Sequence, residues 1–382
     1  MPVAGIIAEY NPFHNGHLYQ IKEVKKKFPD APLVVAMSGN FLQRGEPASF
    51  DKWTRAQQAL ANGADLVVEM PVLACVQPAD RFAFNGVSIL ASLGVTDLFF
   101  GAEHAEYDFT AYARLVQSTH GDFKTYNESY AATFQKAVAA KIGHNVDQPN
   151  DLLGLAYAKA NLKLGEPLFL NPIQRKNANY HEINLKAGTI ASATAIRQHY
   201  LAGNLAKLSA YVPAATLKTL KTQNLLTWDD FFPYLKYKLL STAPARLSEI
   251  YGMAEGIEYR LKEQMERLPS TADFDQWLKA VKTKRFTYTR LSRLACALLL
   301  DLTPAELKEY DQAPYMRLLG FNAKGQQVLR RAKKTSAYQI IAKVSKDDKN
   351  AIYRVDYRAG KIYQLQNQLE QDLKRAPIEV NP

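Results

Sequence analysis

Cysteine is nearly absent from this chain of 382 residues. Only Cys75 and Cys296 occur, far apart and each inside an apolar segment. They form neither a disulfide framework nor the ligand spacing of a zinc site. The chain also lacks the 18-residue apolar run of a membrane-spanning helix and an N-terminal secretion signal. We therefore expect a soluble protein of the reducing cytoplasm, not attached to a membrane, with both cysteines buried.

The composition and the charge distribution indicate a globular protein with two unlike parts. Hydrophobic residues make up 47% of the chain and charged residues 22%, and the length predicts two domains. The net charge is +11, but residues 1–200 carry equal numbers of basic and acidic side chains, so the whole excess follows residue 200. A neutral first half suits a small-molecule site, and a basic second half suits a polyanionic partner. A bias that serves solubility alone is the alternative.

Short apolar runs alternate with helical patterns through the first half of the chain. Strands are expected at residues 3–8, 33–37, 65–69, 98–100 and 167–170, and helices at 16–27, 52–62, 82–93, 151–164 and 194–202. Strands that are continuously apolar are buried on both faces, which predicts a parallel sheet covered by helices. We therefore predict an α/β fold with a doubly wound, Rossmann-like parallel sheet over residues 1–203.

After residue 203 the strand pattern fades and helical patterns dominate. They are expected at residues 233–240, 250–267, 274–283, 288–300 and 323–331. We predict that residues 204–382 form a mostly α-helical second domain.

The segment EYNPFHNGH, residues 9–17, follows the first expected strand. In a doubly wound sheet the first strand-to-helix turn commonly holds a phosphate. His14 and His17 would share one face of the first helical turn, beside backbone N–H groups that favour phosphate. Gly16 costs about 1 kcal/mol of helix propensity relative to alanine, which makes sense if a ligand passes close to the backbone.

Two other interpretations of the histidines stay open on these residues alone. His14 could cap the helix while His17 packs against the sheet. The pair could instead be half of a metal site, but no adjacent acidic residue completes one.

A second segment, IASATAIR at residues 190–197, precedes the last helix expected in the first domain. Ser192 and Thr194 can offer hydroxyls and a helix N-terminus to phosphates, and Arg197 supplies a guanidinium suited to oxyanions. An ordinary helix cap at Ser192 or Thr194 is the alternative.

NPFHNGH and IASATAIR resemble the two phosphate-binding signatures of the nucleotidyltransferase superfamily, which includes class I aminoacyl-tRNA synthetases. Three further segments narrow the resemblance. MSGNFLQRGEP (residues 37–47), FFGAEH (99–104) and QPNDLLG (148–154) follow in an order and spacing similar to the tRNA(Met) cytidine acetate ligase family. The resemblance covers essentially the whole α/β domain.

The resemblance implies a reaction. ATP and acetate would form acetyl-adenylate, and the acetyl group would pass to N4 of the wobble cytidine in the anticodon loop of elongator tRNA(Met). Mg²⁺ would arrive with ATP, without a metal site made of protein ligands. A small-molecule adenylyltransferase and a non-catalytic RNA-binding protein are the alternatives, and the oligomeric state is not predicted.

The resemblance also implies roles for individual residues. His14 and His17 are expected to stabilise the transition state, with Arg197 on the pyrophosphate side. The residues expected to bind ATP are Ile7, Ala8, Glu9, Tyr10, Asn11, Pro12, Phe13, His14, Asn15, Gly16, His17, Leu18, Tyr19, Gln20, Gly101, Asn150, Arg175, Ser192 and Thr194. An ordinary helix cap is the alternative for Asn150. Gln43 and Arg44 are expected to orient acetate or contact the nucleotide, unless they belong to a plain surface loop.

Basic residues of the second half are interleaved with aromatic ones, a pattern that suits phosphate contacts and base stacking. The residues expected to bind RNA are Lys284, Arg285, Arg290, Arg330 and Arg331, within a larger basic set that includes Lys282, Arg293, Lys333 and Lys334 and is accompanied by Phe286 and Tyr288. Helix faces that are merely solvated are the alternative.

Overall fold

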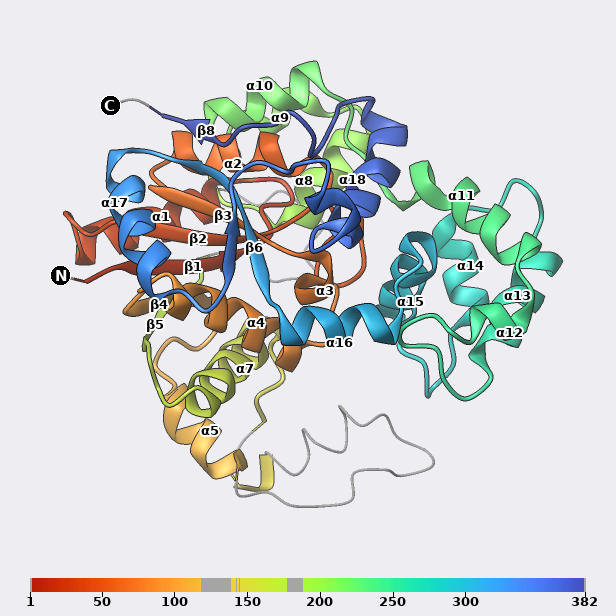
Figure 1. Cartoon of the computed structure of the whole chain (residues 1–382), viewed down its shortest axis with the longest axis horizontal. Helices are drawn as coiled ribbons and strands as arrows, with labels where there is room; N and C mark the ends of the chain where they lie inside the picture. Colours follow the sequence, from red (N-terminus) through yellow and green to blue (C-terminus); the bar gives the residue numbers. More distant parts are fainter. Residues whose placement is uncertain (1, 118–138, 142, 144, 177–187, 381–382) are drawn as a thin grey trace.

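The computed structural model describes residues 2–117, 139–141, 143, 145–176 and 188–380. Within these residues a single mixed sheet has the strand order β5-β4-β1-β2-β3-β6-β7, and β8 pairs with β6 (Figure 1). The strands are β1 (Ala4–Ala8), β2 (Leu33–Ser38), β3 (Leu66–Met70), β4 (Asp97–Ala102), β5 (Phe169–Gln174), β6 (Tyr315–Phe321), β7 (Gln339–Ile341) and β8 (Ile378–Glu379). The strands β1 to β5 are parallel to one another.

Helices cover both faces of the sheet because alternate residues of each strand point to opposite sides. In β2, Val34 and Ala36 join the core beneath α4 (Ala79–Ser92) and α7 (Pro149–Lys163), whereas Val35 and Met37 join the core beneath α1 (Asn15–Lys27) and α2 (Lys52–Ala61). The prediction of a doubly wound α/β fold is confirmed. Both cysteines are buried, as expected.

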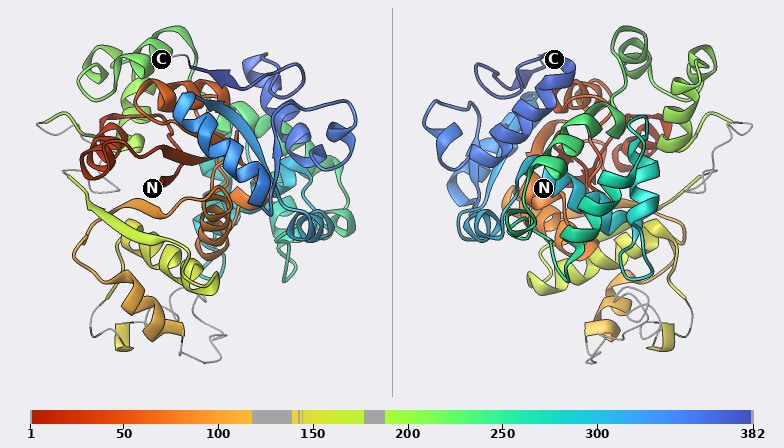
Figure 2. Two further views of the ribbon diagram at one scale, coloured as in Figure 1. Left: turned by 60° about the vertical axis from the view of Figure 1, so that its left-hand side comes forward. Right: turned by 90° about the vertical axis from the view of Figure 1, so that its right-hand side faces the viewer.

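A helical region stands beside the sheet at one end of the molecule (Figure 1), and it faces the viewer in the right-hand view of Figure 2. Its large core is built around side chains such as Phe231, Trp277 and Leu298. The helices are α11 (Trp228–Ser241), α12 (Pro244–Leu247), α13 (Ile257–Arg267), α14 (Phe274–Val281) and α15 (Tyr288–Leu300).

The other helices connect or flank these layers. They are α3 (Val72–Cys75), α5 (Phe109–Gln117), α8 (Ala193–Leu201), α9 (Leu205–Leu208), α10 (Ala214–Thr222), α16 (Pro304–Gln312), α17 (Ala323–Thr335) and α18 (Arg354–Asn367), with a 3₁₀ helix at Asp348–Asn350. No helix in the described part of the chain is both long and apolar enough to cross a membrane.

The expectation that the strands lie before residue 203 is wrong. β6, β7 and β8 come from residues 315–379, and β6 pairs antiparallel with β3, so the sheet is not purely parallel. The assignment of the small-molecule site to residues 1–203 and of the polyanionic partner to residues 204–382 stays a prediction.

Element boundaries also differ for local reasons. The helix expected from residue 250 begins at Ile257, because Gly252 and Gly256 adopt φ of 87° and 73° and interrupt the pattern. The strand expected at 167–170 extends to Gln174 and tolerates Pro172, since β5 is an edge strand paired with β4.

Candidate active site

The loop between β1 and α1 crosses the carboxyl edge of the sheet. It contains a cis peptide bond between Asn11 and Pro12, and Tyr10 has a left-handed φ of 53°. The buried rings of Tyr10 and Phe13 lie against the His17 ring, with centroids 4.8 Å and 5.6 Å away. The loop thereby packs the His17 ring against two aromatic rings.

The two histidines are held in one tautomer by the backbone. His14 Nδ1 accepts a hydrogen bond from Gly16 N at 3.0 Å, and His17 Nδ1 accepts from His14 N at 3.2 Å. A ring nitrogen that accepts a hydrogen bond carries no hydrogen, so this network assigns the hydrogen of both neutral rings to Nε2. The rings are stacked with centroids 3.8 Å apart. His14 therefore caps α1, and both rings keep an Nε2–H donor.

Both rings are neutral at physiological pH. Burial, followed by the charges of Arg175 and Arg197, lowers the pKa of His14 to about 3. Burial, then His14 and Arg175, lowers the pKa of His17 well below its ordinary value. The pair thus offers hydrogen bonds rather than positive charge, and the arginines supply the charge.

Gly16 lies directly against the ring of His14. A Cβ atom at this position would lie 2.7 Å from Cε1 and 2.9 Å from Nδ1 of His14. The missing side chain makes room for the capping ring of His14, and the expectation that it also lets a ligand approach stays a prediction.

The NPFHNGH and IASATAIR segments meet in space, although they are far apart in the sequence. Asn15 Nδ2 donates to Thr189 O and Ala210 O, each at 2.9 Å. Arg197 Nη1 donates to Asn11 O at 2.7 Å, and its other terminal nitrogen, Nη2, lies 3.8 Å from Glu46 Oε2. The structure therefore places Arg197 against the backbone of the loop between β1 and α1, here called the histidine loop.

Ser192 is the N-cap of α8. Its side chain accepts from Ala195 N at 3.1 Å, and Thr194 follows in the first turn of the helix. Capping, which the sequence left open, is therefore confirmed for Ser192.

Gly101, Arg175 and Asn150 come together through Glu103. Arg175 crosses Gly101, where a Cβ atom would meet its Cγ at 3.4 Å, and Arg175 Nε lies 3.5 Å from Glu103 Oε1. Asn150 donates to Glu103 from its backbone N at 3.0 Å and from Nδ2 at 2.5 Å. Asn150 is therefore not the cap of α7, which is Gln148; its amide holds Glu103 instead.

The sequence reasoning missed Glu103, His104 and Asp151. Glu103 Oε2 accepts from Asp151 N at 3.1 Å, and Asp151 Oδ2 lies 2.6 Å from His104 Nδ1. The hydrogen bond to Asp151 raises the pKa of His104. The signal was available, because these residues belong to FFGAEH and QPNDLLG, the segments that interlock here.

Several expected ATP-binding residues belong to the scaffold of the site. Ile7 and Ala8 end β1, and Pro12 and Phe13 are buried. Leu18, Tyr19 and Gln20 lie in the first turns of α1, where Gln20 Nε2 donates to Phe99 O at 3.3 Å.

The segment at residues 39–47, here called the bridge loop, lies beside Glu9. Gln43 N donates to Glu9 Oε1 at 2.8 Å, and Gln43 Nε2 donates to Gln77 O at 2.7 Å. The Gln43 side chain is thus engaged by the protein. Arg55 is fully buried and donates to Glu9 O at 2.7 Å and Ser38 O at 3.0 Å, which fixes the ends of β1 and β2.

The expected RNA-binding residues do not form one cluster. Lys284, Arg285 and Arg290 lie where α14 leads into α15, and Arg285 pairs with Glu255 at 3.1 Å. Arg330 and Arg331 lie on α17, toward the opposite end of the molecule (Figure 1).

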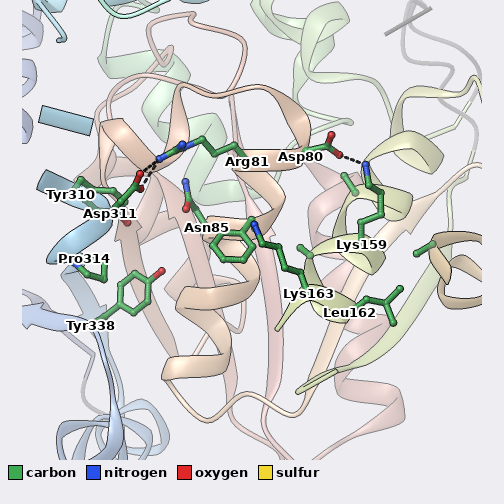
Figure 3. Close-up of a pocket in the computed structure, with 14 residues that line it drawn as sticks. Asp80, Arg81, Asn85, Lys159, Leu162, Lys163, Tyr310, Asp311, Pro314 and Tyr338 are labelled. Carbon is green, nitrogen blue, oxygen red and sulfur yellow. Dashed lines mark hydrogen bonds and ion pairs between the residues drawn. The ribbon is translucent and has the colours of Figure 1, made fainter. Parts of the chain in front are cut away.

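A cavity of about 660 Å³ lies away from the histidines, between α4, α7 and α16 (Figure 3). Ion pairs occupy its rims, with 2.5 Å between Arg81 and Asp311 and 3.0 Å between Lys159 and Asp80. None of the expected site residues lines it. Across the described ranges, no group of three His, Cys, Asp or Glu residues could hold a metal ion.

A doubly wound sheet with two neutral histidines at the start of its first helix, flanked by two arginines, defines a nucleotidyltransferase of the HxGH type. A family model described as HIGH Nucleotidyl Transferase matches residues 1–376.

The chain is 58% identical over 380 residues to the tRNA(Met) cytidine acetate ligase of Ligilactobacillus salivarius, covering 99% of this chain and 100% of that protein. It is 43% identical to the enzyme of the same name from Lactiplantibacillus plantarum, covering 99% of this chain and 98% of that one. The crystal structure of Thermotoga maritima TmcAL bound with alpha-thio ATP matches with a TM-score of 0.88 and 27% identity over the whole of both chains. The chain therefore belongs to the HIGH nucleotidyl transferase family and, within it, to the tRNA(Met) cytidine acetate ligase family.

Proposed function

We propose that this protein is an ATP-dependent acetate ligase that acetylates N4 of the wobble cytidine in the anticodon loop of elongator tRNA(Met). One observation supports the proposal above all others. His14 and His17 are neutral, stacked and fixed as Nε2–H donors at the N-terminus of α1, with Arg175 and Arg197 beside them. Such an arrangement suits the charge that develops on a phosphorus centre under attack.

In the first step, a carboxylate oxygen of acetate attacks the α-phosphorus of ATP, and the bond to pyrophosphate breaks. The reaction needs positioning and charge stabilisation rather than a protein nucleophile. We assign the Nε2–H groups of His14 and His17 to the oxygens of the five-coordinate phosphorus, and Arg197 to the departing pyrophosphate. Residues 7–20 with Gly101, Asn150, Arg175, Ser192 and Thr194 would surround the nucleotide.

In the second step, the N4 amine of cytidine attacks the carbonyl carbon of acetyl-adenylate. AMP leaves with the shared oxygen, and the nitrogen loses one proton. A base within a structured loop must be unstacked to reach the mixed anhydride.

Mg²⁺ would accompany ATP, held by phosphate and water oxygens. The described residues offer no carboxylate cage that would compete for it. A cytoplasmic location suits an enzyme that acts on tRNA with ATP.

Exchange of labelled pyrophosphate into ATP tests the first step. We expect exchange that depends on added acetate, and a series of short carboxylates then reports the selectivity. Turnover with a phosphorylated small molecule but not with acetate would identify an adenylyltransferase. Absence of exchange with every acid would favour a non-catalytic RNA-binding protein.

Acetylation of transcribed elongator tRNA(Met) tests the second step. With ATP and acetate, we expect acetylcytidine at the wobble position, detected by mass spectrometry of nuclease fragments. The same tRNA with the wobble cytidine replaced by uridine is the control, and an unmodified product from the cytidine tRNA would contradict the proposal.

A further inference from the structure

The bridge loop packs against α15 by backbone contact. Gly45 O accepts from Trp228 Nε1 at 3.0 Å and from Ser292 Oγ at 3.4 Å. Gly45 has a φ of +80°, and a Cβ atom there would lie 2.5 Å from Cα of Arg293. The loop and the first half of α15 therefore pack directly against each other.

The other side of the bridge loop faces the histidine loop. Gln43 N binds Glu9 Oε1 at 2.8 Å, and Glu46 approaches Arg197, which itself binds Asn11 O. The bridge loop thus contacts both the candidate phosphate site and α15.

Positive charge gathers where the bridge loop meets α15. Arg290 and Arg293 are three residues apart on one helix face, and Arg44 precedes the glycine that touches Arg293. Burial and the charges of Arg44 and Arg290 lower the pKa of Arg293 to about 10. Among the residues that the structure describes, neither Arg290 nor Arg293 forms an ion pair, and the nearby Glu46 approaches Arg197 instead.

Aromatic rings flank this charge. The Arg290 guanidinium lies 4.3 Å from the centroid of the buried Phe286 ring, which holds its plane in place. Tyr288, in the next turn of chain, keeps 40% of its surface exposed.

We infer that Arg44, Arg290 and Arg293 form a phosphate-binding seam that holds the RNA backbone beside the cytidine being acetylated. The inference rests on the proposed function, because it takes RNA as the substrate. Guanidinium groups bind phosphodiesters with two parallel hydrogen bonds, and an anion relieves the repulsion among them. An exposed tyrosine next to them gives an unstacked base a surface. Arg44 of the bridge loop would then contact RNA phosphate, while the Gln43 side chain donates to Gln77 O.

The test compares two double variants with the same loss of charge. The seam variant is Arg290→Gln with Arg293→Gln, and the control is Lys218→Gln with Lys221→Gln, two exposed positions of α10. Thermal unfolding establishes that both are folded. Equilibrium binding of tRNA is measured at several salt concentrations, and acetate-dependent exchange is measured without tRNA.

We expect the seam variant to bind tRNA about 10-fold to 100-fold more weakly and to lose roughly 1.4 from its logarithmic salt slope, about 0.7 for each single-strand phosphate contact. Its exchange rate and KM for ATP should stay within twofold of the wild type. The control should keep both its affinity and its salt slope.

Equal weakening of both variants would overturn the seam, because it would indicate diffuse attraction by the basic surface. A raised KM for ATP in the seam variant would also overturn it, since the arginines would then serve the nucleotide. If the wild type shows no acetate-dependent exchange, the proposed function fails, whereas the difference in tRNA affinity between the variants still decides the seam.

Discussion

Each of the two histidines uses its two nitrogens for different purposes. Nδ1 of His14 accepts the N–H of Gly16 and caps α1, and Nδ1 of His17 accepts the N–H of His14. The Nε2–H group of each ring is left for a ligand. Capping and phosphate binding, which compete as readings of the sequence, are therefore compatible in one residue.

Substitution His14→Asn should separate these two uses. Asparagine is a preferred N-cap and can accept from Gly16 N, but it has no group in place of Nε2–H. We expect a free energy of unfolding within about 0.5 kcal/mol of the wild type and exchange reduced about 100-fold or more. Urea unfolding and pyrophosphate exchange measure the two effects.

His14→Ala is the matched control. It should lose the exchange and also about 1 kcal/mol of stability with the cap. Normal exchange in the asparagine variant would show that Nε2 of His14 has no catalytic role.

The lowered pKa of His14 predicts a pH dependence of stability. The unfolded chain takes up a proton at this histidine below about pH 6.5, whereas the folded chain does so only near pH 3. Stability from this site is therefore fully present above pH 6.5 and is lost as the pH falls toward 3. Between pH 7 and pH 5, urea unfolding should show a larger loss for the wild type than for His14→Asn. Equal losses would contradict a neutral His14 ring in the folded protein.

Substitution Gly16→Ala should lower the exchange activity while it raises the helix propensity of α1. Alanine gains about 1 kcal/mol in a helix, but its Cβ would displace the His14 ring. We expect an unfolding free energy equal to or above that of the wild type, together with at least 10-fold slower exchange. An active variant would show that the ring position is not critical.

At the scale of elements, a buried ionic network joins four parts of the fold. Lys52 Nζ on α2 lies 2.8 Å from Glu69 Oε2 of β3, 2.7 Å from Asp372 Oδ1 and 3.0 Å from Tyr353 OH. These side chains are almost completely buried. The network attaches α18 and the segment that follows it to the middle of the sheet.

Removal of the lysine should expose how much the fold depends on this network. Lys52→Met leaves two carboxylates buried without their cation, and the loss of one partner from a buried ion pair typically costs about 3–5 kcal/mol. Lys22→Met, at an exposed position of α1, is the control and should change stability by less than about 0.5 kcal/mol. Denaturant unfolding of both variants gives the comparison, and equal effects would contradict this role.

At the scale of the whole molecule, the chain leaves the sheet after β5, builds the helical region and returns to the sheet with β6. β6 pairs with β3 across the edge that β3 would otherwise expose, and every residue of β3 is buried. The helical region is therefore inserted within the α/β fold rather than appended to it.

A fragment of residues 1–203 should consequently fail to fold. Without β6, the fragment would expose the unpaired edge of the apolar strand β3, which favours aggregation. We expect little soluble protein and no cooperative unfolding, with the full chain as the control. A soluble fragment that unfolds cooperatively and exchanges pyrophosphate would identify residues 1–203 as an independent domain.

The elements that the sequence predicted are those whose pattern is local. β1 to β4 are short apolar runs, and α15 was predicted at its observed bounds because its apolar positions recur with the helical period. β6 was missed because YMRLLGF carries Arg317 within its apolar run and stands among helical patterns, and its partner β3 lies about 250 residues earlier in the chain.

The sequence alone determined the α/β class of the fold, the position of the turn that we propose binds phosphate and the segments that meet there, since each depends on neighbours within one motif or on the carboxyl ends of parallel strands. Only the tertiary structure decided which nitrogen of each histidine is available, that a Cβ at Gly16 would meet the His14 ring, and that the Gln43 side chain donates to Gln77 O. It also separated Arg290 from Arg330 and brought the bridge loop to α15. These features depend on contacts between segments far apart in the chain, and the local pattern of residues carries no information about such contacts.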